Sequence, residues 1–145
     1  MNIPNAKELL EFIDLTRGVD KLHYDYFKNL TIISSSSILI VFAFYEKVGA
    51  KLFYWQKAML VSSLFLFFAL IWRSLNAMQH AGNATVYLNA MQIAIKKDDN
   101  AELINLLSKR EATQDAISNI DKVTKFFYLA GIGIILSLTA FLLLS

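Results

Sequence analysis

The chain has 145 residues, of which 56% are hydrophobic and 18% are charged, and its formal net charge at pH 7 is +2. A soluble domain usually carries about 25% charged residues, so this composition argues against a water-soluble protein. The small net charge gives no indication of a nucleic-acid partner, and the absence of cysteine excludes disulfides and thiolate metal sites.

Residues 1–26 are predicted to form an N-terminal amphipathic helical segment. A short helix is expected over residues 5–17, because Leu9, Phe12 and Ile13 cluster on one side and Gly18 favours a stop. Such a helix lies at the membrane interface or packs on its own protein. Its polar face is acidic, which suits anionic lipid poorly and favours packing on the protein.

Residues 27–73 are predicted to form a transmembrane hairpin, with spans at about 27–45 and 52–72. An α-helix needs roughly 20 apolar residues to cross about 30 Å of hydrocarbon, and both segments approach that length. Neither span has an ionisable residue at its middle, which is atypical of proton relays and ion-coupled transporters. The expected membrane-interface anchors are Trp55, Lys57, Trp72 and Arg73.

Small hydroxyl side chains interrupt both spans. Four consecutive serines point in directions about 100° apart on a helix, so they cannot all face one partner. They are interpreted either as helix-packing residues that bond to the carbonyl one turn back or as the polar lining of a pore. The pore or helix-packing candidates are Ser34, Ser35, Ser36, Ser37, Ser62 and Ser63. Ser62 and Ser63 are also expected to hydrogen-bond to the serines of the first span.

Residues 74–125 are predicted to form a cytoplasmic antiparallel helical pair that extends the second and third spans. The turn is expected at residues 98–100, with Asn100 as the cap of the following helix. Asp98, Asp99 and Arg110 are the candidates for docking a cytoplasmic protein. Residues 126–145 carry no charge and are predicted to be the third transmembrane helix. The expected fold class is therefore an all-α integral membrane protein with three transmembrane helices.

The distribution of lysine and arginine predicts the orientation. The N-terminal part and the segment between the second and third spans share one side of the membrane and hold most of the basic residues, whereas the hairpin link and its flank hold Lys47, Lys51 and Lys57. The positive-inside rule places the richer side in the cytoplasm. We therefore expect a multi-pass inner-membrane protein with a cytoplasmic N-terminus and an external C-terminus.

Arg73 and His80 are the one pair that suggests catalysis. Their spacing resembles the R-x(4–6)-H motif of HEPN ribonucleases, which implies that the two side chains would bind and activate an RNA phosphate at a dimer interface. The simpler interpretation is that Arg73 ends a membrane helix. The sequence contains no metalloprotease, hydrolase, Walker or dinucleotide motif, so we expect no catalytic residue, no cofactor and no metal.

The arrangement over residues 20–125, a membrane hairpin whose second helix continues into a cytoplasmic helical extension, resembles the SLATT-type membrane effectors of prokaryotic defence systems. This resemblance implies a homo-oligomer that permeabilises or depolarises the inner membrane when a cytoplasmic partner or signal triggers it. Three functions are compared: such a non-enzymatic effector, a scaffold subunit that docks a cytoplasmic protein through residues 74–125, and a membrane enzyme that uses Arg73 and His80. A phage holin is a further alternative, disfavoured by the long cytoplasmic insertion.

Overall fold

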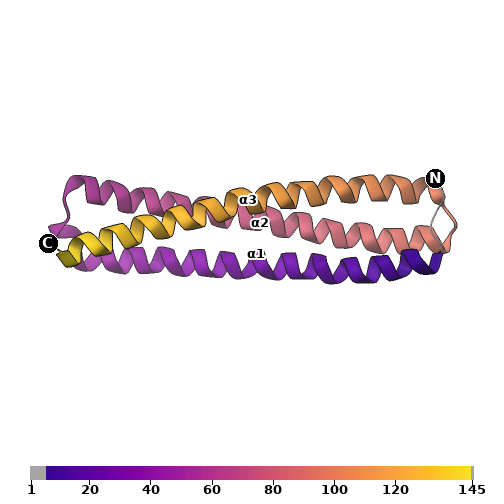
Figure 1. Cartoon of the computed structure of the whole chain (residues 1–145), viewed down its shortest axis with the longest axis horizontal. Coiled ribbons are helices and arrows are strands. Elements are labelled where there is room, and N and C mark those ends of the chain that lie inside the picture. The colour runs from indigo at the N-terminus through magenta and orange to yellow at the C-terminus, as the bar shows by residue number, and fades with distance from the viewer. Residues whose placement is uncertain (1–5, 145) are drawn as a thin grey trace. The chain divides into compact units, whose positions relative to one another are not determined.

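The computed structural model describes residues 6–144, with the side chains of residues 6, 48, 51, 138 and 141–144 left out of the description. Three long helices make up this part of the chain: α1 (Ala6–Val48), α2 (Tyr54–Lys96) and α3 (Asn100–Leu144) (Figure 1). A short 3-10 turn, η1 (Gly49–Lys51), connects α1 to α2. The expected all-helical class is confirmed, and residues 6–144 contain no strand.

The separate N-terminal helix predicted to stop at Gly18 is not observed, because α1 runs without a break from Ala6 to Val48. Thr16 and Asp20, on either side of this glycine, are both buried against the rest of the chain. A glycine inside a helix costs about 1 kcal/mol relative to alanine. Packing of the flanking turns offsets that small cost, so Gly18 does not end the helix. Residues 1–5 of the predicted segment lie outside the described residues.

Two helices, α1 and α2, are long and apolar enough to cross a membrane. In each of them 28% of the most apolar window is buried within the structure, whereas the core helix of a soluble protein would be mostly buried there. The third span, predicted for residues 126–145, falls on α3, and the described residues do not identify α3 as a further candidate. Ser145 itself lies outside the described part of the chain.

The described chain divides into two compact units. Unit 1 contains the residues up to Phe27 together with 76–119, and unit 2 contains residues 28–75 together with those from 120 onward. Each helix contributes one segment to each unit, so both units consist of three helical segments.

The core of unit 1 contains apolar side chains from all three helices. Its members are Leu9, Ile13, Leu88, Met91, Ala94, Leu103 and Leu106. On α2 the buried side chains of this unit follow the alternating four- and three-residue spacing of a coiled-coil seam: Ala77, Ala81, Ala84, Leu88 and Met91. Within the range predicted as a helical pair, α2 and α3 both supply side chains to this core, and the start of α1 packs with them as a third helical segment.

The reversal between α2 and α3 uses two consecutive aspartates. The backbone N–H of Asp98 donates to the carbonyl of Ile95 and that of Asp99 to the carbonyl of Ala94, the pattern of a Schellman helix end. Asp98 adopts a φ of 55°, the left-handed conformation that this end requires. Asp99 Oδ1 then accepts the N–H of Glu102 at 3.0 Å, so Asp99 is the cap of α3 and the expected cap at Asn100 is wrong.

The core of unit 2 is apolar. One cluster is formed around Val41, Leu52 and Leu60, and another around Ile38, Phe67 and Leu70. Gly131 of α3 lies against the Phe67 ring, where an added Cβ would come within 3.1 Å of the ring. The glycine therefore permits a close approach of α3 to α2 that a side chain would obstruct.

Candidate functional site

A buried ion pair joins α1 to α3 inside unit 1. Arg110 Nη2 donates to Asp20 Oδ1 at 3.5 Å, and the two residues are 4% and 1% exposed. Asp20 Oδ2 and Arg110 Nε have no hydrogen-bond partner among the described residues. A buried pair with unsatisfied atoms recovers little of its desolvation cost, whereas removing one partner alone leaves a buried charge uncompensated.

Burial raises the pKa of the Asp20 carboxyl above its ordinary value, even though the charge and hydrogen bond of Arg110 and the charge of His23 act in the opposite direction. Desolvation disfavours the charged carboxylate more than these neighbours favour it. The protonation of the Asp20 carboxyl is therefore tied to the packing of the helices around it.

Arg17 connects α1 to α2 in the same unit. Its Nη2 atom donates to Asn89 Oδ1 and to Gln92 Oε1, both at 3.1 Å, and its Nη1 atom lies 3.3 Å from Asp14 Oδ1. In the sequence, Arg17 is distinguished only as one of the basic residues of the N-terminal part. Its amide partners lie more than 70 positions further along the chain, so no local pattern could have revealed this contact.

Unit 2 buries hydroxyl groups where unit 1 buries charges. Ser34 on α1, Ser74 on α2 and Thr124 on α3 are fully buried, and none of their side-chain oxygens has a partner among the described residues. Ser74 and Thr124 each lie seven positions from the contact between Phe67 and Gly131, in opposite directions along the chain. These segments of α2 and α3 run antiparallel, so seven residues forward on α2 and seven residues back on α3 lead to the same height along the helix axes. Ser74 and Thr124 are therefore at about the same height.

The serine candidates divide according to burial. Ser35, Ser36 and Ser37 donate to the carbonyls of the residues four positions earlier, at 2.9, 3.0 and 2.9 Å. Ser62 donates to its own helix at 2.9 Å, and the buried Ser63 does so at 2.7 Å. The predicted bonding one turn back is therefore observed for the exposed serines. The predicted hydrogen bonds from Ser62 and Ser63 to the serines of the first span are wrong, because both hydroxyls bond to carbonyls of α2.

The anchor candidates lie near the ends of the unit 2 segment of α2. Trp55 and Trp72 are exposed, and Lys57 is half-buried. The Arg73 guanidinium carbon lies 5.7 Å from the centre of the Phe127 ring, a cation–π distance. Arg73 thus has a packing role within unit 2, whereas His80, its predicted catalytic partner, belongs to unit 1.

The docking candidates occupy structural positions. Asp98 and Asp99 form the reversal described above, and both are exposed. Arg110 is buried against Asp20, so its expected place on a docking surface is wrong. The physical reason is that Arg110 follows the same buried spacing as Leu103 and Leu106, and its charge is met by a carboxylate from α1.

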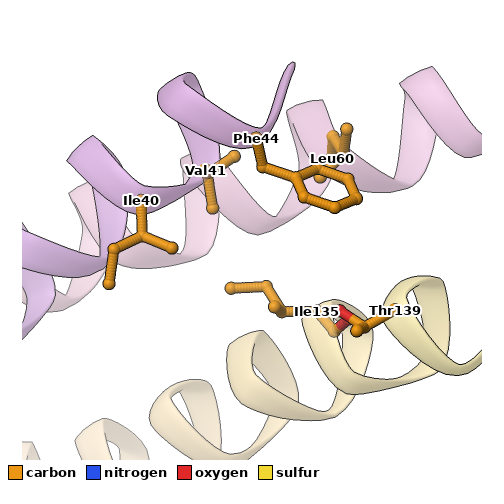
Figure 2. A pocket seen from close by; sticks show the side chains of 6 residues that line it. All are labelled: Ile40, Val41, Phe44, Leu60, Ile135 and Thr139. Atoms are coloured by element: carbon orange, nitrogen blue, oxygen red, sulfur yellow. The ribbon is translucent and has the colours of Figure 1, made fainter. Parts of the chain in front are cut away.

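Each unit has a hollow lined by its described residues. Figure 2 shows the hollow of about 90 Å³ in unit 2, which side chains from all three helices line. These residues are Ile40, Val41, Phe44, Leu60, Ile135 and Thr139. The Thr139 hydroxyl already donates to Ile135 O at 2.9 Å, so the hollow presents no free polar group. The hollow of unit 1, about 210 Å³, lies beside the α2–α3 reversal and combines apolar with charged lining residues.

Among the described residues, no group of three or more histidine, cysteine, aspartate or glutamate side chains could hold a metal ion. The features that the described residues offer are a buried ion pair in unit 1, buried hydroxyl groups in unit 2 and exposed apolar side chains. Comparisons with protein-family models, with curated proteins and with solved structures find no match to this chain.

Proposed function

We propose that this protein is a non-enzymatic, oligomeric inner-membrane effector that crosses the bilayer three times and permeabilises it through contacts between copies. The observation that carries the proposal is the surface of unit 2, where exposed side chains are large and apolar on helices of membrane length. Among them are Leu39, Ile40, Phe42, Phe65, Phe68 and Trp72. Such a surface is stable in lipid and would aggregate in water.

The location of the hydroxyls supports a path between copies. Phe67 and Leu70 fill the interior of unit 2 and are fully buried, so a path for ions through a single copy would have to displace a packed core. Ser35, Ser36 and Ser62 lie on the outside of the unit instead. Their hydroxyls would line a contact between copies, where a second copy or water can share their hydrogen bonds.

The resemblance to SLATT-type defence proteins supports the same function by analogy. In this proposal α3 supplies the third span over residues 126–145, the N-terminus is cytoplasmic and unit 1 is the cytoplasmic part that responds to a trigger. The positive-inside distribution of lysine and arginine supports this orientation.

The test is the mass of the purified protein in detergent, together with the membrane potential of cells that overproduce it. A discrete oligomer and loss of the potential are expected. Ser36→Leu should preserve the oligomer and reduce depolarisation at least tenfold. Ala43→Leu, two turns along the same helix, adds similar bulk without removing a hydroxyl and should still depolarise. A monomer that leaves the potential unchanged would contradict the proposal.

The hollow of unit 1 favours the second candidate, a scaffold subunit that docks a cytoplasmic protein. Ile93 and Leu106 supply apolar lining there, and Lys97, Asp99 and Glu102 supply charges. Such a mixed hollow suits a short protein segment with an apolar anchor and polar flanks. A scaffold would remain monomeric until its partner binds, so the same measurement of mass distinguishes it from the effector.

A further inference from the structure

The starting observation is an apolar stripe on the unit 1 part of α1 that the chain itself does not cover. Phe12, Leu15, Val19 and Leu22, here named the α1 stripe, are 48%, 76%, 45% and 70% exposed. They are distinct from the buried face of the same helix, which carries Leu9 and Ile13. The predicted clustering of Phe12 with Leu9 and Ile13 on one side was therefore wrong, because α1 has two apolar faces.

The spacing of the α1 stripe is that of a coiled-coil seam. Its members follow one another at three, four and three residues, and Tyr26 occupies the next position. In heptad terms Phe12 and Val19 take position a, and Leu15 and Leu22 take position d. Val19 with leucine at both d positions is the combination that favours two parallel strands, whereas Phe12 at the other a position is aromatic and not β-branched. The described exposed apolar residues on α2 and α3 in unit 1, such as Val86, Ile93 and Ile104, form no run of this kind.

The charges beside the α1 stripe distinguish the two possible directions of pairing. The g positions of this heptad are Glu11, Gly18 and Asp25. In an antiparallel pair centred on the stripe, Glu11 of each copy would lie opposite Asp25 of the other, and like charges would repel twice. In a parallel pair the g positions lie opposite e positions, which are Thr16 and His23. Thr16 is buried within its own copy and neither residue is acidic, so this direction brings no two acids together.

Lipid is a poorer occupant of the same surface. A helix that lies flat on a membrane must turn away from the span that follows, and α1 continues without a break into the residues of unit 2. Asp14, Arg17 and Lys21 also surround the helix at the level of the stripe, and charged side chains do not enter hydrocarbon at low cost.

We infer that the α1 stripe is the pairing surface for a second copy of this chain, with the two α1 helices parallel. The parallel direction rests on the proposed function, because copies inserted in one membrane with the same orientation have parallel α1 helices. Pairing is isologous, so each copy presents the same four side chains and the two stripes cover one another. Larger assemblies then add contacts from other surfaces to this pair.

Single cysteines test the inference directly, because the chain contains no cysteine of its own. Leu15→Cys and Leu22→Cys each place a thiol at a d position, where paired Cα atoms come within the roughly 4.4–6.8 Å that a disulfide spans. Mild oxidation of membranes should link most of each variant into dimers. Asp14→Cys and Lys21→Cys are the matched controls, exposed on the same helix but turned about 100° away, and should cross-link at least tenfold less.

Three results would overturn the inference. Equal cross-linking of all four variants would show random collision, and cross-links that appear only when Leu15→Cys and Leu22→Cys are mixed would show an antiparallel pair. If the thiols of these two variants were shielded from a water-soluble thiol reagent without any dimer forming, lipid would be the occupant of the stripe.

A second readout does not depend on cross-linking. Leu22→Glu should shift the purified full-length protein from paired to unpaired mass, whereas Lys21→Gln, which changes the net charge equally at the neighbouring exposed position, should not. Unchanged mass for Leu22→Glu would contradict pairing. Membrane potential, followed in the same cells, separates the two proposals. Selective cross-linking without loss of the membrane potential would contradict the effector function and leave the pairing supported. Loss of the potential without selective cross-linking would contradict the pairing and leave the effector function supported.

Discussion

The two units solve the problem of burying polar groups differently. Unit 1 buries a charged pair, Asp20 and Arg110, and exposes charges around the α1 stripe. In unit 2 the described polar residues that are buried as a whole carry a hydroxyl or an amide and no charge, and large apolar side chains are exposed. A charge can be accommodated in a core when a partner from another helix meets it, whereas burying a neutral hydroxyl costs less even where, as at Ser34, Ser74 and Thr124, no partner is found among the described residues. The difference matches a proposed change of surroundings from water to lipid along each helix.

The largest expected effect comes from breaking the ion pair of unit 1. Arg110→Met leaves the Asp20 carboxylate buried without a partner and should lower the free energy of unfolding by about 3–5 kcal/mol. The double variant Asp20→Leu/Arg110→Met removes both charges and should recover most of that loss. Thermal unfolding in detergent, followed by circular dichroism, measures both. A double variant as unstable as the single one would show that the pair is needed for more than mutual neutralisation.

Next in size is the close approach of α3 to α2 in unit 2. Gly131→Ala inserts a methyl group against the fully buried Phe67 ring and should cost about 1–3 kcal/mol. Gly82→Ala in unit 1 is the matched control, because nothing lies within 4 Å of the added Cβ there. It should stabilise the protein by about 1 kcal/mol through helix propensity. The same unfolding measurement applies, and an equal sign for the two variants would contradict the assigned role of Gly131.

A smaller effect on stability is expected from removing single buried hydroxyls of unit 2, and its sign should depend on whether the hydroxyl has a hydrogen-bond partner. Thr124→Val removes a hydroxyl without a partner among the described residues and should be neutral or stabilise by up to about 1 kcal/mol. Ser63→Ala removes the 2.7 Å bond to Leu60 O and should destabilise by about 1 kcal/mol. Comparing their unfolding free energies tests whether the hydroxyl of Thr124 is unsatisfied. A clear loss of stability for Thr124→Val would mean that this hydroxyl makes a bond that stabilises the core.

The smallest expected effect is a pH slope that belongs to unit 1. Burial raises the pKa of Asp20 above its ordinary value of 3.8. At a pH between 3.8 and the pKa of the folded state, the native state therefore retains a proton there that the unfolded state has lost. The contribution of Asp20 to stability is therefore complete below pH 3.8 and falls as pH rises through the pKa of the folded state. Asp20→Asn should flatten this slope, with Asp14→Asn as the control at an exposed position of the same helix. An unchanged slope in Asp20→Asn would contradict the assignment.

Local patterns predicted the features that depend on neighbouring residues. The all-helical class, the membrane length of two helices and the reversal near residues 98–100 follow from apolar run length and turn chemistry. The continuity of α1 could not be predicted, because the packing that stabilises the helix around Gly18 comes from residues distant in the chain. The Asp20–Arg110 pair spans 90 positions. One signal for it was present, since Arg110 and Thr113 interrupt an apolar face at core positions.

The core of unit 1 cannot form fully until late in synthesis of the chain. Leu9 and Ile13 pack with Leu103 and Leu106, which leave the ribosome almost a hundred residues later. At roughly 5–20 residues per second, that delay amounts to about 5–20 s. During this interval the buried face of α1 can pack only with the α2 members of the core, Leu88, Met91 and Ala94. A chain that stops before α3 would leave this core without its α3 side chains, so truncated products of this protein are expected to be targets for chaperones and proteases.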